Sequence, residues 1–473
     1  MDIAIILAFI TYFSILFLIG FFALKKSMQS SDFILGSRSI NYWVTAISVQ
    51  ASDMSGWLFM GYPAMVYAHG ASKAWIALGL MVGMFLTWHF VAYQLRVATE
   101  KYNSKTLSSF FESRFSDTSG LIRIISAVFC LVFFTFYISA SLVELGLLFK
   151  SLLGLSYHLG VTIGVVVVFY TLFGGFTSMA WIDFFQGLFL LAMLMIVPCI
   201  ALGRLGGWGV IAYAAQVKGV SLSLLPYSFE SLRDIIFISL EWGLGYFGLP
   251  HILTKFMGID DASKIRQAKY LGLTWQVLAL SSATLVGLVG IAYFPAGAVD
   301  SQLIFINMVK DLFTPFFAGF ILCAIVAAAI NVIGAQILVS ASIIAEDFYK
   351  KFKKMSEHRD VVHEQKQVLW FSRGAVLVIC LLAYGSAFTT SDTIFNLVKY
   401  AWSGLGCTFG PLVLVSLHTR TTNRYVALTG IIVGGLTGAF WPHFGSTVPA
   451  MIAGYVASFS CMGLVAWLVP QKK

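Results

Sequence analysis

The sequence contains few charged residues. Of its 473 residues, 11% are Asp, Glu, Lys or Arg, whereas roughly a quarter of an average globular sequence is charged. Hydrophobic residues make up 59% of the chain. A protein with so little charge could not solvate its surface in water. The composition therefore excludes a soluble globular protein and indicates a protein of the lipid bilayer.

The sequence also lacks the short motifs of common enzyme classes. Its eight histidines form no HExxH pattern, and it has neither a phosphate-binding loop nor a nucleophile elbow. The six cysteines lie within apolar segments and none is paired at metal-ligand spacing, which is typical of small buried hydrophobic residues. We therefore expect neither an enzyme nor a resident cofactor.

What the chain does contain is a series of apolar runs. Each is about 20 residues long, which is enough to cross a hydrocarbon layer about 30 Å thick. We count 13 segments with no soluble domain between them, at residues 3–24, 42–66, 74–94, 122–148, 156–174, 178–202, 234–256, 270–294, 315–346, 368–389, 394–417, 426–444 and 448–469. The first follows Asp2 rather than a basic region, so we read it as a retained helix and not a signal peptide. The pattern predicts an all-α protein that crosses the inner (cytoplasmic) cell membrane many times.

Lysine and arginine are unevenly divided between the connections. Of 30 such residues, 23, with Lys255 among them, lie on one side, six lie on the other, and Lys399 falls inside a span. Because cytoplasmic connections carry the excess of positive charge, this asymmetry predicts an outside N-terminus and a cytoplasmic C-terminus. It also accounts for the net charge of +9 without a nucleic-acid partner. No obligate protein partner is indicated.

Two spans contain residues that interrupt a helix. The second span holds Asp53 between Ser52 and Ser55. The seventh runs through Glu241 to Pro250 and has three glycines before the proline, which weaken a helix and free backbone carbonyls. Irregular backbone at membrane depth is tolerated only where it is buried in protein or lines a cavity.

These two spans lie five apart, so they cross the membrane in opposite directions. Interrupted helices at matching places in two inverted halves are typical of secondary transporters, whose binding site lies near the midplane. We therefore expect one transmembrane transporter domain over residues 1–473. Its inverted repeats would be residues 42–202 and 234–417, with peripheral helices at 3–24 and 426–469.

Several blocks of sequence form recognisable motifs. The most specific are Ala51–Trp57 (ASDMSGW) and Trp242–Gly248 (WGLGYFG), the latter followed by Pro250 and His251. Further blocks are Ser31–Gly36, Tyr170–Phe176, Trp181–Gly187, Gln336–Val339, Glu346–Asp347 and Tyr400–Gly404. From the first span to about residue 440, the chain resembles the solute:sodium symporter family, and its proline branch in particular. The resemblance implies the LeuT fold, with a 5+5 inverted repeat and with substrate and sodium held between the unwound helices and the ninth span.

The resemblance also implies a substrate site. Its residues would be Ser55, Gly56, Trp242, Tyr246 and Pro250. In such a site, helix ends and freed amides would hold a substrate carboxylate, and aromatic faces would cover an apolar ring.

A sodium site follows from the same resemblance. Backbone carbonyls of Ala51, Met54 and Ala328 would bind the ion together with two adjacent hydroxyls, Ser then Thr, on the ninth span. This chain has Asn331 and Val332 there. Asn331 retains an oxygen for a hard cation, but Val332 cannot coordinate one. We therefore expect weakened sodium binding, and the coupling ion, sodium or proton, stays open.

Five ionisable residues inside spans are candidates for coupling or gating. They are Asp53, Asp183, Glu144, Glu241 and Lys399. Asp53 and Asp183 match acids important in the family, whereas the other three stand where neutral residues are expected. An ionisable residue in a span is a functional-site hypothesis. For Lys399 three alternatives stay open: snorkelling to the interface, pairing with Glu241 or Glu144 as an outer gate or proton route, or recognition of another substrate.

Together these patterns predict an ion-coupled importer of a small zwitterionic amino acid, with L-proline as the first candidate. One alternative is a symporter of another small zwitterionic solute. The other is a membrane sensor with a transporter-like module. A sensor would be expected to carry a cytoplasmic signalling domain, and the sequence ends at Lys473 without one.

Overall fold

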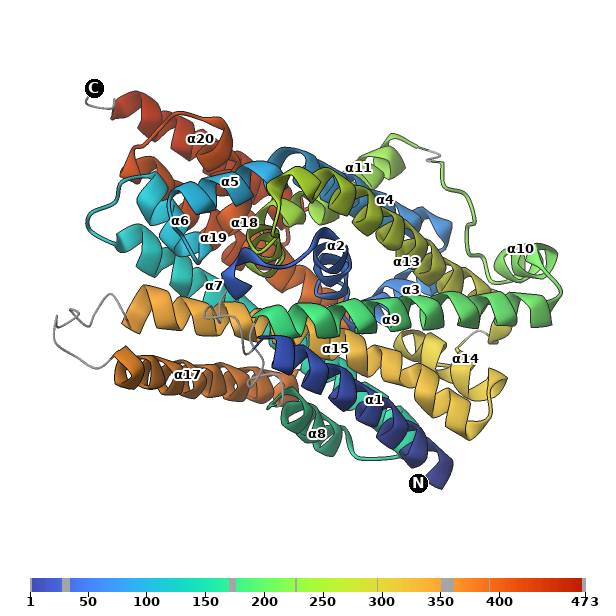
Figure 1. Ribbon diagram of the computed structural model, residues 1–473. Helices are drawn as coiled ribbons and strands as arrows, with labels where there is room; N and C mark the ends of the chain where they lie inside the picture. The colour runs from blue at the N-terminus through green and yellow to red at the C-terminus, as the bar shows by residue number, and fades with distance from the viewer. Residues whose placement is uncertain are drawn as a thin grey trace.

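The computed structural model describes residues 2–27, 35–169, 176–225, 228–295, 297–349, 361–390 and 392–469. Within these ranges the chain forms helices and no strand, as Figure 1 shows. Its one pairing of extended backbone there is an isolated parallel bridge between Ile40 and Ile259. The all-α prediction is confirmed. Two pieces of the family motifs, residues 31–34 and 170–175, lie outside the described residues.

The helices coincide with the predicted segments. Their bounds are Ile3–Ser27 (α1), Tyr42–Ala51 (α2), Gly61–His69 (α3), Ala74–Thr87 (α4), Tyr93–Lys101 (α5), Leu107–Arg114 (α6), Leu121–Leu153 (α7), Tyr157–Phe169 (α8), Phe176–Leu205 (α9), Trp208–Val217 (α10), Phe229–Gly245 (α11), Pro250–Met257 (α12), Ile265–Tyr293 (α13), Ile304–Leu312 (α14), Pro315–Ile343 (α15), Val361–Thr389 (α17), Ile394–His418 (α18), Arg424–Phe440 (α19) and Ala450–Leu468 (α20). Each of the 13 segments overlaps one of these helices or a consecutive pair. The sequence predicted no helix for α6, α10 and α14.

Length and composition qualify many of these helices as membrane spans. In the described part of the chain, eight helices are long and apolar enough to cross a bilayer, and the bent pair α11–α12 makes a ninth. Four shorter apolar helices are Ile3–Ile19, Tyr157–Val166, Trp208–Val217 and Val376–Thr389. The prediction of a multi-pass membrane protein is confirmed. The count of 13 spans, the outside N-terminus and the bounds of the two repeats remain predictions.

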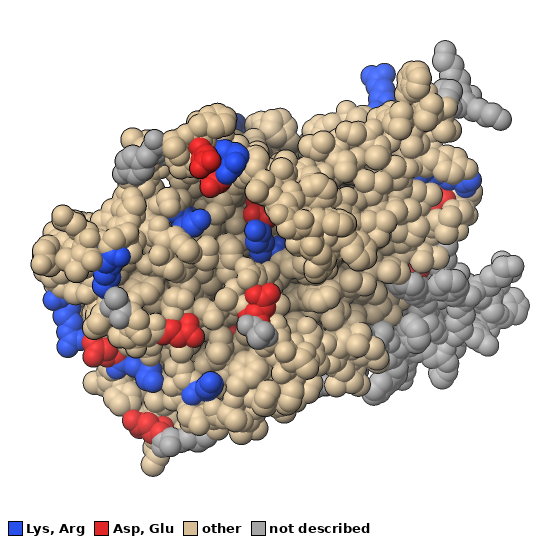
Figure 2. Space-filling model, turned by 180° about the vertical axis from the view of Figure 1, so that it is seen from behind, with Lys and Arg blue, Asp and Glu red and all other residues tan. Residues whose placement is uncertain are grey.

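The surface of the molecule suits a lipid environment. Figure 2 shows a face on which charged side chains are few and scattered among other residues. Large apolar side chains are exposed on many helices, including Phe17, Val166, Leu382 and Trp467. In a water-soluble monomer so much exposed apolar surface would promote association, whereas lipid tails solvate it.

The core is organised around α15. Every residue from Ile321 to Ser340 is buried, and no charged side chain occurs between Pro315 and Ile343. A helix that is apolar on all sides must be enclosed by other helices. α1, α7 and α9 supply this enclosure, and Figure 1 shows α9 and α15 running side by side through the middle of the view.

The first interruption follows α2. Ser52 donates its hydroxyl hydrogen bond back to the carbonyl of Ser48 at 2.6 Å, and the chain then leaves the helix before Ser55. Short polar side chains offer the backbone such local alternatives to a helix. Ser55 caps a single 3₁₀ turn, η2 (Gly56–Leu58), by accepting from the amide of Trp57 at 3.1 Å. The chain becomes helical again in α3. The interruption predicted from the sequence is present.

The second interruption separates α11 from α12. After α11 ends at Gly245, a 3₁₀ turn, η6 (Tyr246–Gly248), is followed by the extended residue Leu249 and by Pro250 at the first position of α12. Proline disfavours helical backbone in the residue before it and is well accommodated at a helix start. The two helical parts are bent by 47°.

A close helix contact fixes the position of this second interruption. A Cβ atom on Gly83 of α4 would lie only 2.1 Å from the carbonyl oxygen of Gly243 on α11. Small residues let membrane helices approach backbone to backbone. The contact therefore holds Leu80 of α4 and Trp242 of α11 on neighbouring surfaces.

Candidate functional site

A small pocket lies beside the two interruptions. Its lining comes from the α2–η2 link, α4, α7, α11, η6 and α18, and consists of Asp53, Met54, Ser55, Trp57, Leu80, Tyr137, Trp242, Tyr246, Val398 and Trp402. The free space at its centre is about that of one water molecule. Side chains must therefore move apart before a larger ligand can enter.

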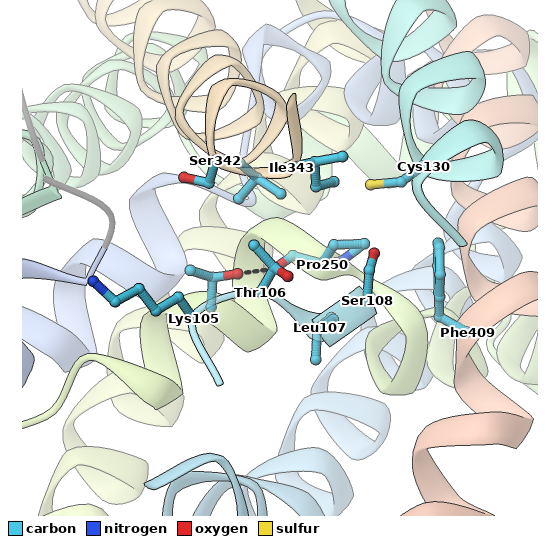
Figure 3. Close-up of a pocket in the computed structure, with 11 residues that line it drawn as sticks. Lys105, Thr106, Leu107, Ser108, Cys130, Pro250, Ser342, Ile343 and Phe409 are labelled. Carbon is cyan, nitrogen blue, oxygen red and sulfur yellow. Dashed lines mark hydrogen bonds between the residues drawn. The ribbon is translucent and has the colours of Figure 1, made fainter. Parts of the chain in front are cut away.

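The structure brings most of the expected substrate residues to this pocket. Ser55, Trp242 and Tyr246 line it, and Gly56 follows Ser55 directly. Pro250 is the exception. It lies in a separate pocket with Lys105, Thr106, Leu107, Ser108, Cys130, Thr254, Val339, Ser342, Ile343 and Phe409, shown in Figure 3. The reason is geometric: Leu249 is extended, so α12 starts on the far side of the break.

Asp53 connects the two interruptions. Its Oδ2 atom accepts a hydrogen bond from the hydroxyl of Tyr246 at 2.5 Å, and the Tyr246 oxygen accepts another from Nε2 of Gln276 at 3.0 Å. Asp53 is buried, and its Oδ1 atom has no hydrogen-bond partner among the described residues. One oxygen of this carboxylate therefore remains available to a ligand.

Glu144 lies directly behind Ser55. Its side chain is fully buried on α7, and its Oε1 atom accepts a hydrogen bond from the Ser55 hydroxyl at 3.0 Å. A Cβ atom on Gly56 would lie 2.7 Å from Oε2, so the carboxylate rests against the Gly56 backbone. Within the described part of the chain, Oε2 has no hydrogen-bond partner.

Aromatic rings form much of the pocket wall. The rings of Trp57 and Trp242 have centroids 4.9 Å apart, those of Trp242 and Trp402 are 5.6 Å apart, and Tyr246 meets Trp402 edge to face at 5.0 Å. The indole nitrogens of all three tryptophans are buried without an acceptor among the described residues. Buried tryptophan N–H groups usually have a hydrogen-bond acceptor, so these three can donate to a bound ligand.

Asp183 forms a buried ion pair. Its Oδ2 atom accepts from Nζ of Lys255 on α12 and from the hydroxyl of Ser48 on α2, the latter at 2.8 Å. Lys255 was counted from the sequence among the solvated charges of one side, but it lies within α12 and is buried. Its side chain is only 3% exposed, because Asp183 of α9 and the ring of Phe176 enclose it.

The expected sodium residues are buried at the centre of the molecule. Ala51 ends α2 and Met54 lies within the first interruption, while Ala328 and Asn331 lie on α15, which packs against α2 and η2. Neither polar atom of the Asn331 side chain has a partner among the described residues. An unpartnered buried amide oxygen is a suitable ligand for a hard cation, whereas the neighbouring Val332 presents only methyl groups.

Lys399 pairs with Glu241. Nζ of Lys399, on α18, lies 3.2 Å from Oε2 of Glu241 on α11. The lysine side chain is 42% exposed and the glutamate 5%. Of the two predicted partners for Lys399, Glu241 is confirmed. Since Val398 and Trp242 line the pocket, the ion pair stands next to its wall.

Several site residues were missed from the sequence. Trp57, Trp402 and Tyr137 line the pocket, Gln276 holds Tyr246, and Lys255 neutralises Asp183. The two tryptophans could have been predicted from the motifs, because Trp57 ends Ala51–Trp57 and Trp402 is the middle residue of Tyr400–Gly404. For Lys255 the available signal was its place inside the predicted apolar segment 234–256, one residue before its end.

Comparison with known proteins decides the family. The model of the sodium:solute symporter family matches residues 33–434. The chain belongs to this family. It is 41% identical to the high-affinity proline transporter PutP of Bacillus subtilis over 459 residues, which cover 95% of each chain. It is also 41% identical to a sodium/proline symporter of Staphylococcus aureus over 437 residues, or 91% of this chain and 84% of that one.

A solved structure supports the fold of this symporter. A sodium-coupled sialic acid symporter in a substrate-bound, outward-open state superposes with a TM-score of 0.80 over 99% of both chains, at 16% identity. At this identity the likeness concerns the fold alone, and it confirms the LeuT-like architecture. The protein is thus a multi-pass transporter of the cell membrane and not an enzyme.

Proposed function

We propose that this symporter imports a small zwitterionic amino acid, with L-proline as the first candidate substrate. The observation that carries the proposal is the pocket between Asp53 and the tryptophans. It offers carboxylate oxygens for an ammonium group, indole N–H groups for a carboxylate, and aromatic faces for a compact apolar body. The two proline-transporting relatives support the same substrate.

Sodium is the coupling ion that the family favours, and we propose that it binds through Ala51, Met54, Ala328 and Asn331. The missing hydroxyl at Val332 weakens this site. Protons carried by buried carboxylates are the second source of driving force. A Na⁺ requirement at unusually high concentration and proton-driven uptake are the two forms that this coupling would take.

The five ionisable residues receive separate roles in this proposal. Asp53 and Glu144 act at the pocket, and Asp183 acts through its ion pair with Lys255 between α9 and α12. Glu241 and Lys399 form an outer gate that opens when their ion pair separates. Pro250 contributes through the start of α12 and not through contact with the substrate.

Uptake of radiolabelled proline into proteoliposomes tests the proposal. Sodium and proton gradients are imposed separately, and unlabelled solutes compete with the tracer. We expect one of the two gradients, sodium or proton, to stimulate uptake. We also expect small zwitterions to inhibit it. If sugars or dicarboxylates displace the tracer better than proline does, the substrate assignment is wrong.

A further inference from the structure

Lys269 is a buried cation near the start of α13. It is only 7% exposed, yet its ammonium group has neither an ion-pair nor a hydrogen-bond partner among the described residues. Lys255, the other buried lysine in the described ranges, has Asp183 as its partner. A charge removed from water is costly unless an opposite charge accompanies it. An anion supplied from outside the chain would therefore stabilise the protein at Lys269.

Two aromatic rings flank this ammonium group. Nζ of Lys269 lies 5.1 Å from the ring centroid of Phe85 on α4 and 4.8 Å from that of Tyr270 on α13. Both distances are typical of cation–π contacts. The ring of His89, in the π-helical turn η4 (Trp88–Ala92), stacks on Phe85 at 5.8 Å. The flanking rings replace part of the hydration of the ammonium group, but they carry no negative charge and do not neutralise it.

The same rings lie at the outer surface of the helix bundle. The side chain of Tyr270 is 53% exposed and that of Phe85 is 39% exposed. They come from neighbouring helices, because α13 packs against α4, as Figure 1 shows. In a protein that crosses the bilayer, exposed side chains on spans meet lipid, and exposed aromatic residues are enriched at the level of the head groups. An anion that reaches Lys269 between these rings therefore comes from the lipid side.

The depth of Lys269 agrees with a head-group contact. It precedes Gln276, which donates to the pocket residue Tyr246, by about 10 Å along the axis of α13. Transporter sites lie near the midplane, and half of the hydrocarbon layer is about 15 Å thick. Long side chains on a helix lean toward its N-terminus. Nζ of Lys269 is thus placed near the boundary between acyl chains and head groups.

Arg266 adds a second positive charge beside Lys269. It is exposed, lies three residues earlier on the same face of α13, and has no ion-pair partner within the described ranges. Lys264, by contrast, lies 4.0 Å from Oδ2 of Asp261. Two cations at a spacing of three residues repel each other. An anion bound to both removes this repulsion, and the leaflet on the predicted cytoplasmic side carries anionic lipids.

We propose that Lys269 and Arg266 bind the head-group phosphate of an anionic phospholipid at the surface of α4 and α13. Phe85 and Tyr270 pack against the glycerol and acyl parts of the same lipid. This site is separate from the proposed substrate and sodium sites and does not depend on them. Because α13 also carries Gln276, the lipid stabilises the helix that positions Tyr246 at the pocket.

Lipid titrations of the purified full chain in detergent micelles test this site. Phosphatidylglycerol and phosphatidylcholine with the same acyl chains are compared, and inorganic phosphate is titrated separately. A ligand that binds only the folded state raises the unfolding temperature with concentration, so each titration gives an apparent Kd. We expect the wild type to bind phosphatidylglycerol at least about fivefold more tightly than phosphatidylcholine, because one cation near anionic lipid contributes about 1 kcal/mol. Inorganic phosphate should not reproduce the shift.

Variants of the two cations locate the site on α13. Lys269→Met keeps an apolar stem between the rings and removes the charge, so the preference for phosphatidylglycerol should fall by about fivefold. Lys269→Arg keeps the charge and should keep the preference. Arg266→Gln should lower the preference as well, and it serves as the test if Lys269→Met does not fold. Lys264→Gln, which removes a nearby charge paired with Asp261, is the matched control and should leave the preference unchanged.

Three results would overturn the inference. One is a wild type that binds the two lipids equally tightly. Another is a folded Lys269→Met that keeps the full preference, or a Lys264→Gln that loses as much of it, since attraction would then be general to the basic surface. The third is a shift with inorganic phosphate as large as that with phosphatidylglycerol, which would identify a site for a soluble anion and not for a lipid.

Discussion

Two buried carboxylates of this symporter differ in how their charge is balanced. Asp183 has its cation within the chain, because Lys255 reaches it from α12 and Ser48 adds a hydrogen bond. Glu144 accepts one hydrogen bond from Ser55 and, among the described residues, has no Lys or Arg at ion-pair distance. Both are buried equally well, at 1% and 0% exposed.

The difference distinguishes a carboxylate that is neutralised within the protein, Asp183, from one that a bound cation could neutralise, Glu144. A complete ion pair with hydrogen bonds can hold helices together without any external group. A carboxylate without a cation raises the free energy of the empty protein, and a bound cation lowers it. Asp183 therefore contributes to the packing of α2, α9 and α12, whereas Asp53 lines the pocket and Glu144 lies behind the pocket residue Ser55.

Removing the ligand-facing carboxylate should have the largest effect on transport. We predict that Asp53→Ala nearly abolishes proline uptake while expression and membrane insertion stay normal, since Asp53 contributes to the pocket and not to an internal ion pair. The measurement is uptake into proteoliposomes at matched protein amounts. Asp53→Asn, which keeps one acceptor oxygen, is the control and should retain more activity. If Asp53→Ala takes up proline as fast as the wild type, Asp53 is not part of the substrate site.

Breaking the internal ion pair should affect stability instead. Lys255→Met leaves Asp183 buried without its cation, and we expect a loss of about 3–5 kcal/mol in the free energy of unfolding. Denaturant titration in detergent micelles measures it.

A double variant supplies the control for this prediction. Asp183→Asn with Lys255→Met removes both charges, so it should be more stable than Lys255→Met alone. Equal losses in the single and double variants would show that the unpaired Asp183 charge costs nothing once Lys255 is removed, which contradicts the prediction.

A third prediction concerns the cation site on α15. Asn331→Ser combined with Val332→Thr restores two adjacent hydroxyls beside Ala328. One oxygen contact to a cation contributes about 1.5–3 kcal/mol, so the apparent sodium affinity for uptake should rise by about one to two orders of magnitude. Uptake measured across a sodium titration checks this. If the wild type already saturates at low sodium and the double variant gains nothing, Asn331 compensates fully for Val332.

The sequence predicted the helices and the interruptions well but the partners of buried charges only in part. Polar residues around Asp53 and the glycines before Pro250 predicted both breaks, because their effects on helical backbone are local. Lys255 was misplaced, since a lysine at the end of an apolar segment has the same local pattern whether it faces solvent or a buried Asp183. Pro250 was assigned to the substrate site, yet one extended residue, Leu249, moves it to another pocket. Such outcomes depend on contacts between helices far apart in the sequence.

A third carboxylate, Asp117, lies outside the spans and is stabilised mainly by hydrogen bonds. It precedes α7, where its Oδ2 atom accepts from the amide of Ile122 at 2.9 Å and its Oδ1 atom accepts from the amide of Ser119 at 3.0 Å. Burial alone would raise the pKa of Asp117. The hydrogen bond from the Ser119 hydroxyl, the two amide hydrogen bonds and the charge of Arg424 outweigh burial and lower the pKa below its ordinary value of 3.8. Asp117 thereby supplies an acceptor for the amide of Ile122, which lies in the first turn of α7 and has no acceptor within the helix.

The smallest predicted effect is therefore that of Asp117→Ala, a loss of about 1 kcal/mol in the free energy of unfolding at pH 7, as for other helix-capping residues. A lowered pKa means that the folded state stabilises the ionised carboxylate. The contribution is thus complete above the ordinary pKa and disappears as the pH falls through the lowered one. Thermal unfolding in detergent at pH 7 and at pH values below 3.8 should show the wild type and the variant converging in acid. If the unfolding temperatures of the wild type and the variant differ by the same amount at both pH values, Asp117 contributes through its shape and not through its charge.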